Sequence, residues 1–105
     1  MSKSIRIRAE QEKDNTTKVR VLIKHPMETG LRKDKKTGQK IPAHFIKEVK
    51  CYHNNELVLD AAWGVAVSQN PYLSFQLDAA AKGDTVRVAW LDNRGGTDQR
   101  EAAIK

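Results

Sequence analysis

Short stretches in which apolar residues alternate with polar or charged ones recur along almost the whole chain, and this pattern constrains the fold more than any other feature. The clearest stretch spans residues 85–91, where Val86, Val88 and Trp90 share one parity. A period of two residues places such side chains on one face of a β-strand. No apolar pattern of helical period lasts long enough to supply the crossover helices of a βαβ fold. The sequence therefore predicts an all-β chain.

The alternation predicts seven or eight strands, with turn signals at intervals of about 8–12 residues. The expected strands are residues 4–9, 18–24, 43–53, 56–60, 63–67, 72–79, 85–91 and 97–104. Asn54-Asn55 is a hairpin signal, because Asn tolerates a positive φ. Residues 79–82 could instead start a helix of one turn, and residues 97–104 could form a frayed helix. The pattern as a whole favours an immunoglobulin-like antiparallel β-sandwich.

Length and composition favour a single domain over residues 1–105. A chain of this length buries roughly 65% of its unfolded surface, which is enough for one core without disulfides. The single cysteine excludes an internal disulfide and a Cys-based zinc site. No apolar run approaches the roughly 20 residues that span a bilayer. The charged N-terminus lacks the apolar segment of a secretory signal, so we expect no cleavable signal on this chain.

Positive charge is concentrated in the first half of the chain. Residues 1–50 contain 14 Lys and Arg against 6 Asp and Glu, whereas residues 51–105 contain 5 against 7. A basic half is typical of a protein that meets an acidic partner, an anionic substrate or nucleic acid, although a solvated lysine-rich surface gives the same composition.

Nucleic-acid binding is the alternative function that this charge suggests. Base stacking needs exposed aromatic residues, and none interleaves with the basic run at residues 32–40. Trp63, Phe75 and Trp90 are in phase with apolar strand faces and are expected in the core. We therefore expect no nucleic-acid partner.

The only candidate nucleophile is Cys51, which Lys50 and His53 could activate. However, Cys51 shares strand parity with Phe45 and Val49, so a small buried hydrophobic side chain is the favoured interpretation. A Cys–His pair also lacks a third group that would orient the histidine. No glycine-rich phosphate loop is present either. We expect no catalytic residue and no cofactor.

His25 and His44 bracket a long connection and could lie near one another in the fold. With Glu28 they could form a metal site, but no ligand-spacing motif supports one. Ordinary hydrogen bonding in the loop is the favoured interpretation, so no metal is expected.

A set of irregular segments gives the chain a more specific resemblance. These are His25-Pro26-Met27-Glu28-Thr29-Gly30, Arg32-Lys33-Asp34, residues 41–46, Trp63-Gly64, residues 67–73, Gly83-Asp84 and Trp90-Leu91-Asp92-Asn93. Through them the chain resembles SoxZ, a component of the bacterial Sox sulfur-oxidation system, from Ile5 to about Ile104. One departure is Asn54-Asn55, where such proteins are expected to have Asn-Gly.

The resemblance implies an immunoglobulin-like β-sandwich that forms a heterodimer with SoxY and meets other Sox enzymes transiently. SoxY carries thiosulfate-derived sulfur on a cysteine in a flexible, glycine-rich C-terminal tail. This chain ends at Lys105 without a Gly-Gly-Cys tail, and Cys51 is expected in mid-strand. The resemblance therefore implies the non-carrier subunit rather than an enzyme. It also implies a periplasmic location, reached by export together with the partner.

The long connection is the expected docking surface. The candidate residues are His25, Met27, Glu28, Leu31, Arg32, Lys33, Lys35, Lys36, Lys40, Ile41, His44 and Ile46. The alternative is a packing loop whose lysines only keep the surface soluble. Without a partner, the chain is expected to form a homodimer through an edge strand or an exposed apolar patch. The contributors expected for that patch are Met27, Leu31, Ile41 and Ile46.

Overall fold

The computed structural model describes residues 4–14, 16–78 and 80–105. Seven strands and no helix are present among these residues, so the all-β prediction is confirmed. The strands are β1 (Ile5–Gln11), β2 (Thr17–Ile23), β3 (Ile46–His53), β4 (Glu56–Ala62), β5 (Tyr72–Leu77), β6 (Thr85–Asp92) and β7 (Thr97–Ala103). The part of the chain described here contains no helix with the length and apolar character needed to span a membrane.

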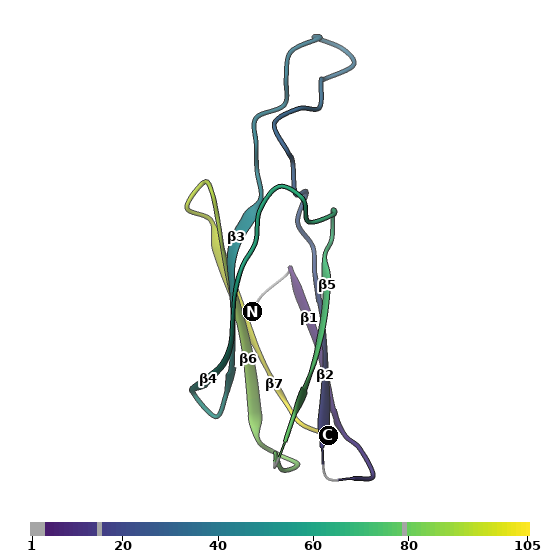
Figure 1. Ribbon diagram of the computed structural model, residues 1–105, viewed down its shortest axis with the longest axis vertical. Helices are drawn as coiled ribbons and strands as arrows, with labels where there is room; N and C mark the ends of the chain where they lie inside the picture. The colour runs from purple at the N-terminus through teal and green to yellow at the C-terminus, as the bar shows by residue number, and fades with distance from the viewer. Residues whose placement is uncertain (1–3, 15, 79) are drawn as a thin grey trace.

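The strands form two sheets that face one another (Figure 1). One sheet has the order β1-β2-β5 and the other the order β4-β3-β6-β7, and every pairing is antiparallel. The predicted antiparallel β-sandwich is therefore confirmed, while its immunoglobulin-like character stays a prediction. β1 also lies beside β7, which brings an edge of each sheet together.

The core fills the space between the two sheets. In β2 every second residue is fully buried, and Val19, Val21 and Ile23 point inward. Val86 and Val88 of β6 supply the opposite wall. β-Branched side chains pack well on a pleated surface, and each one buried contributes about 1.5–3 kcal/mol. The period-two alternation of the sequence thus becomes the inner and outer faces of the sandwich.

The strand predicted at residues 63–67 is wrong. The chain crosses from β4 in one sheet to β5 in the other over residues 63–71 and forms no strand there. Trp63 and Val67 still pack against the core, and this packing produces the apolar alternation that resembled a strand. The backbone N–H of Val67 instead donates to the carbonyl of Gly64, 3.3 Å away.

Strand β3 also differs from its prediction, because it begins at Ile46 and contains a register shift between Ile46 and Glu48. The shift places Ile46 and Val49 on the same buried side, although they have opposite parity. Phe45, predicted to share the face of Val49, precedes the strand and is partly buried against the core.

The turn at Asn54-Asn55 is confirmed, because both residues have a positive φ, of 49° and 70°. Residues 97–103 form strand β7 rather than a helix. Residues 80–84 form a turn and not the start of a helix. Ala79, the first residue of that predicted helical turn, lies outside the described residues.

Between β2 and β3 the chain leaves the sandwich as a long ribbon, here called the arm and defined as residues 26–43 (Figure 1). The arm extends one end of the molecule, whose dimensions are 53 × 23 × 23 Å. A connection of this length in a small domain is commonly functional.

Candidate functional site

The arm is an ordered, irregular two-legged ribbon. Near its base the backbones of Glu28 and His44 exchange two hydrogen bonds, of 2.6 and 2.9 Å. Farther out, the N–H of Ile41 donates to the carbonyl of Arg32 over 2.7 Å. Asp34 closes the tip, because its side chain accepts from the backbone N–H of Lys36 at 2.8 Å. Residues 34–38 thus form the turn at the tip of the ribbon.

The tip of the arm is positively charged and open to solvent. All residues from 31 to 40 are exposed. Glu28 and Arg32 form a bidentate ion pair, with Nη2 2.8 Å from Oε1. The hydrogen bond from Arg32 lowers the pKa of Glu28. The lysines of the tip are Lys33, Lys35, Lys36 and Lys40. Since Arg32 is already paired, these lysines carry the charge that the arm presents.

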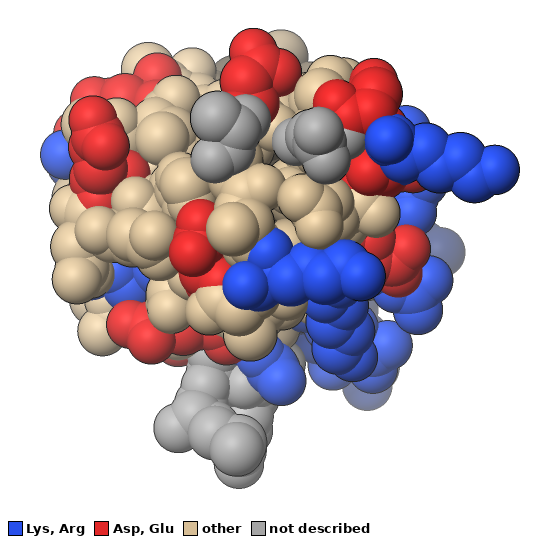
Figure 2. Space-filling view, turned by 90° about the horizontal axis from the view of Figure 1, so that it is seen from below, with Lys and Arg blue, Asp and Glu red and all other residues tan. Residues whose placement is uncertain are grey.

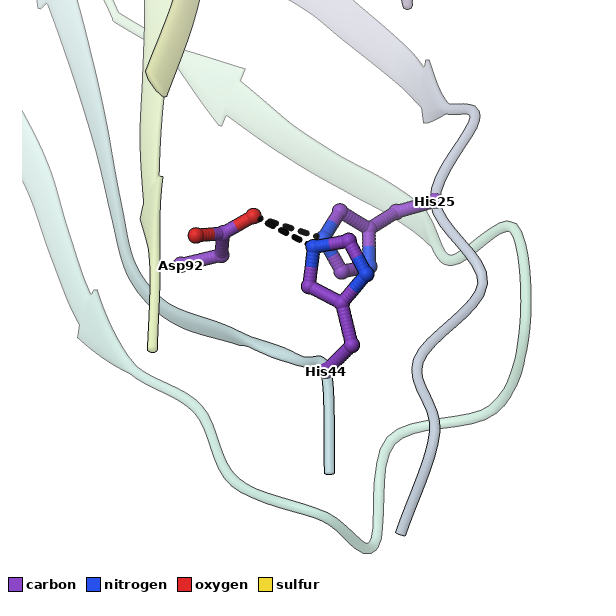
Figure 3. Close-up of side chains that lie close together, drawn as sticks. All are labelled: His25, His44 and Asp92. Carbon is purple, nitrogen blue, oxygen red and sulfur yellow. Dashed lines mark hydrogen bonds and ion pairs between the residues drawn. The ribbon is translucent and has the colours of Figure 1, made fainter. Parts of the chain in front are cut away.

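A cluster of two buried residues and one half-buried residue lies at the base of the arm, and we call it the clamp. It consists of the buried His25 and Asp92 and the half-buried His44 (Figure 3). His25 follows β2, His44 precedes β3 and Asp92 ends β6. Oδ2 of Asp92 lies 3.2 Å from Nε2 of His25 and 2.8 Å from Nε2 of His44. The clamp therefore joins both legs of the arm to a core strand.

The remaining carboxylate oxygen of the clamp is also saturated. Oδ1 of Asp92 accepts from the backbone N–H groups of Gly96, at 2.7 Å, and Arg94, at 3.0 Å. Burial by itself would raise the pKa of Asp92, but the hydrogen bonds from His44, His25 and these two amides lower it overall. Asp92 is thus a buried carboxylate that stays ionised because four donors surround it.

The tautomer of His25 follows from its contacts. Nδ1 accepts a hydrogen bond from the backbone N–H of Met27 at 3.1 Å, so the proton of the neutral ring is on Nε2. That Nε2–H group then donates to Asp92. Burial lowers the pKa of His25, and protonation of Nδ1 would also break the bond from Met27. The ring is therefore held neutral, with its lone pair directed at the backbone.

The clamp has the residue types of a metal site, since its ligand atoms lie within 4.8 Å of one another. A metal on Nε2 of His25 would need a lone pair on that nitrogen. The lone pair is instead on Nδ1, because Nδ1 accepts the hydrogen bond from the N–H of Met27. The arrangement is accordingly a hydrogen-bonded support. His25 and His44 do lie close together, as the sequence suggested, with ring centroids 4.5 Å apart. Glu28, the third ligand considered, instead pairs with Arg32.

Two asparagines reinforce the legs of the arm. Asn70 accepts from the backbone N–H of His25 through its side chain and donates its own N–H to the carbonyl of His25, both at 3.0 Å. Asn93 accepts from Phe45 at 2.8 Å and donates to the carbonyl of Ala43 at 3.0 Å. These bonds, together with the clamp, fix the base of the arm.

Comparison with known proteins identifies the family. The family model described as Sulphur oxidation protein SoxZ matches residues 5–103. The chain belongs to the SoxZ family. Membership gives it a role in the sulfur-oxidation system, in a family of carrier-complex subunits not known as enzymes. No curated protein was found to match the chain.

Solved structures of a superoxide reductase (neelaredoxin) from Ignicoccus hospitalis share the fold of this SoxZ-family chain. One substituted form of that reductase aligns with a TM-score of 0.68 and 20% identity, over 97% of this chain and 78% of that one. A second substituted form gives a TM-score of 0.63 and 18% identity, over 97% and 80%. A third structure gives 0.59 and 18%, over 97% and 80%. At this identity the likeness concerns the fold alone.

The docking residues predicted from the sequence divide into buried and exposed groups. His25, Met27 and Ile46 are buried, and the Met27 sulfur accepts from the backbone N–H of Ile46 at 3.3 Å. The predicted apolar patch does not form on the surface, because two of its four residues, Met27 and Ile46, are buried in the core. Leu31 alone among them is strongly exposed, at 77%, while Ile41 is half-buried.

Asp92, Asn70 and Asn93 are the site residues that sequence reasoning missed. Each lies in one of the segments, residues 67–73 and 90–93, through which the chain resembles SoxZ. The irregular sequence of those segments, which departs from simple strand alternation, was the feature that could have indicated these site residues. They are far from the arm in sequence and meet it only in the folded structure.

Cys51 is fully buried in β3, as its parity predicted. Burial raises the pKa of its thiol to about 12. Nε2 of His53 lies 2.8 Å from Oδ2 of Asp84, so His53 has a different partner from the one considered for catalysis. The position of Cys51 provides no accessible thiolate.

Proposed function

We propose that this chain is the non-carrier subunit of a sulfur-carrier complex. It binds a SoxY-type subunit, whose tail cysteine carries the sulfur intermediates, and it helps to dock the complex on other enzymes of the pathway. The complex works in the periplasm, and this chain is exported while bound to its partner. Two observations support the proposal: the SoxZ family match over residues 5–103 and the burial of the single cysteine.

The burial of Cys51 supports the proposal that the sulfur intermediates are carried by the partner and not by this chain. A carrier thiol must ionise near neutral pH and reach several active sites. Cys51 lies between Leu59 of β4 and Val88 of β6, so exposing it would break two strand ladders. Its high pKa also leaves almost no thiolate at neutral pH.

The arm supports the docking part of the proposal. It carries five Lys and Arg against two Asp and Glu, and the lysines sit at the exposed tip. A fixed base with a charged tip would raise encounter rates with acidic partners. Self-association of the chain alone stays a prediction, now through an edge strand such as β4, where Leu57 and Val58 are exposed.

The test is thiosulfate oxidation in a reconstituted system with Cys51→Ala in this subunit. We expect turnover to be retained, because a buried thiol takes no part in transfer. Replacing the tail cysteine of the partner is the matched control, and it should abolish turnover. Complete loss of turnover with a folded Cys51→Ala subunit would contradict the proposal.

A further inference from the structure

The outer face of the three-stranded sheet carries an arrangement of charges that the proposed function does not use. Strand register places Arg6, Leu22 and Tyr72 in one row across β1, β2 and β5. The next row on the same face contains Arg8 and Arg20. We call these five residues the arginine face. In Figure 2 Lys and Arg gather on the right, which is the side where β1, β2 and β5 lie in Figure 1.

The arginines of this face oppose one another. Arg8 and Arg20 are direct cross-strand partners, and Arg6 is diagonal to Arg20. Like charges directly opposite destabilise an antiparallel pair. The nearest compensation is an exposed contact of 3.8 Å between Arg8 and Glu10. Among residues 4–14, 16–78 and 80–105, no ion pair includes Arg6 or Arg20. The sheet therefore bears a repulsion that an anionic partner would relieve.

Apolar surface adjoins the arginines. Leu22 is 42% exposed and Tyr72 is 60% exposed, and register makes them neighbours. With the three arginines they line a shallow hollow of about 470 Å³. Arg and Tyr are enriched in protein–protein interfaces, where they cluster near the buried centre.

We propose that the arginine face binds an acidic segment of a protein partner. Carboxylates would pair with Arg6, Arg8 and Arg20, whose planar guanidinium groups suit bidentate pairing. An aliphatic or aromatic side chain would lie on Leu22 and Tyr72. Nucleic acid fits less well, because phosphates would pair with the arginines but leave the exposed apolar side chain of Leu22 without a partner. This surface is separate from the arm and goes beyond the proposed function.

The test measures binding of a fluorescein-labelled peptide of 12 residues, rich in Glu and with a central Leu-Phe pair, to the full chain by fluorescence anisotropy. The test variant is Arg8→Gln with Arg20→Gln. The matched control, Lys47→Gln with Lys82→Gln, removes the same charge from exposed positions elsewhere. Leu22→Ser tests the apolar part of the face. A single-stranded oligothymidylate of 12 nucleotides is the competing probe.

We expect the arginine variant to weaken peptide binding by about tenfold or more, and the lysine control by less than about threefold. Leu22→Ser should also weaken binding. The arginine variant should melt at a higher temperature than the wild type at low salt, since its repulsion is removed. Equal losses in both double variants would overturn the proposal, as would no peptide binding at about 1 mM. Tighter binding of the oligonucleotide at the same salt would overturn it too.

Discussion

The two ends of the arm treat charge in opposite ways. At the base, Asp92 is 2% exposed and its two oxygens accept hydrogen bonds from two histidines and two backbone amides. At the tip, four lysines stand in solvent around Asp34. Charges that are buried and saturated hold a structure together, whereas exposed charges contribute little to stability and act on partners. In one connection, therefore, the buried charges fix the base and the exposed charges lie at the tip, where they are open to solvent.

The largest effect should come from Asp92→Ala, because it leaves the donors of His25, Gly96 and Arg94 without an acceptor. We expect the free energy of unfolding to fall by about 3 kcal/mol. Urea denaturation of the variant measures this. Asp60→Ala, which removes an exposed carboxylate, is the control and should stay within about 0.5 kcal/mol of the wild type. Equal free energies of unfolding for the two variants would show that the hydrogen bonds of the clamp do not stabilise the fold.

Gly96→Ala should have the next largest effect. A Cβ at residue 96 would lie 2.8 Å from Oδ2 and 3.0 Å from Oδ1 of Asp92, which four donors hold in place. We expect a loss of about 1–3 kcal/mol in the free energy of unfolding. Gly64→Ala is the matched control, because nothing lies within 4 Å of a Cβ there. If the two substitutions cost the same, the tight packing around Asp92 is not what limits residue 96.

At the tip the expected effect is on association and not on stability. Changing Lys33, Lys35, Lys36 and Lys40 together to Gln should slow association with a sulfur-oxidation partner about tenfold at low salt, and less at high salt. The free energy of unfolding should change by no more than about 0.5 kcal/mol. Stopped-flow association at two salt concentrations measures the first quantity and urea denaturation the second. An unchanged on-rate at low salt would reduce the lysines to a solubilising role.

The smallest effect should be a dependence of stability on pH that originates in the clamp. Burial lowers the pKa of His25 in the folded chain, so the unfolded chain binds the proton more readily. Stability should therefore fall as the pH drops below the ordinary histidine pKa of about 6.5. The lowered pKa of Asp92 extends this loss below about pH 4. Unfolding measured at several pH values, with His25→Gln for comparison, should show a weaker dependence between pH 7 and 5 in the variant. A dependence of the same size in both would assign it to other groups.

Most of the sandwich could be predicted from local pattern. Alternation located the strands, and two asparagines located the turn at residues 54–55. What local pattern could not show were features set by distant neighbours. Trp63 and Val67 alternate because they cover the core from a crossing loop, and the shift in β3 depends on its pairing with β6. Asp92 and the opposition of Arg8 and Arg20 likewise follow from register and topology.

Intact-mass spectrometry can show whether this chain supports a sulfur carrier without carrying sulfur itself. The assembled complex is incubated with thiosulfate and the sulfur-oxidation enzymes, and the masses of both subunits are recorded without reduction. We expect sulfur adducts on the partner subunit and an unchanged mass for this chain, because Cys51 is buried and the pKa of its thiol is raised to about 12. A sulfur adduct on Cys51 of the folded chain, formed at a rate comparable with turnover, would contradict it.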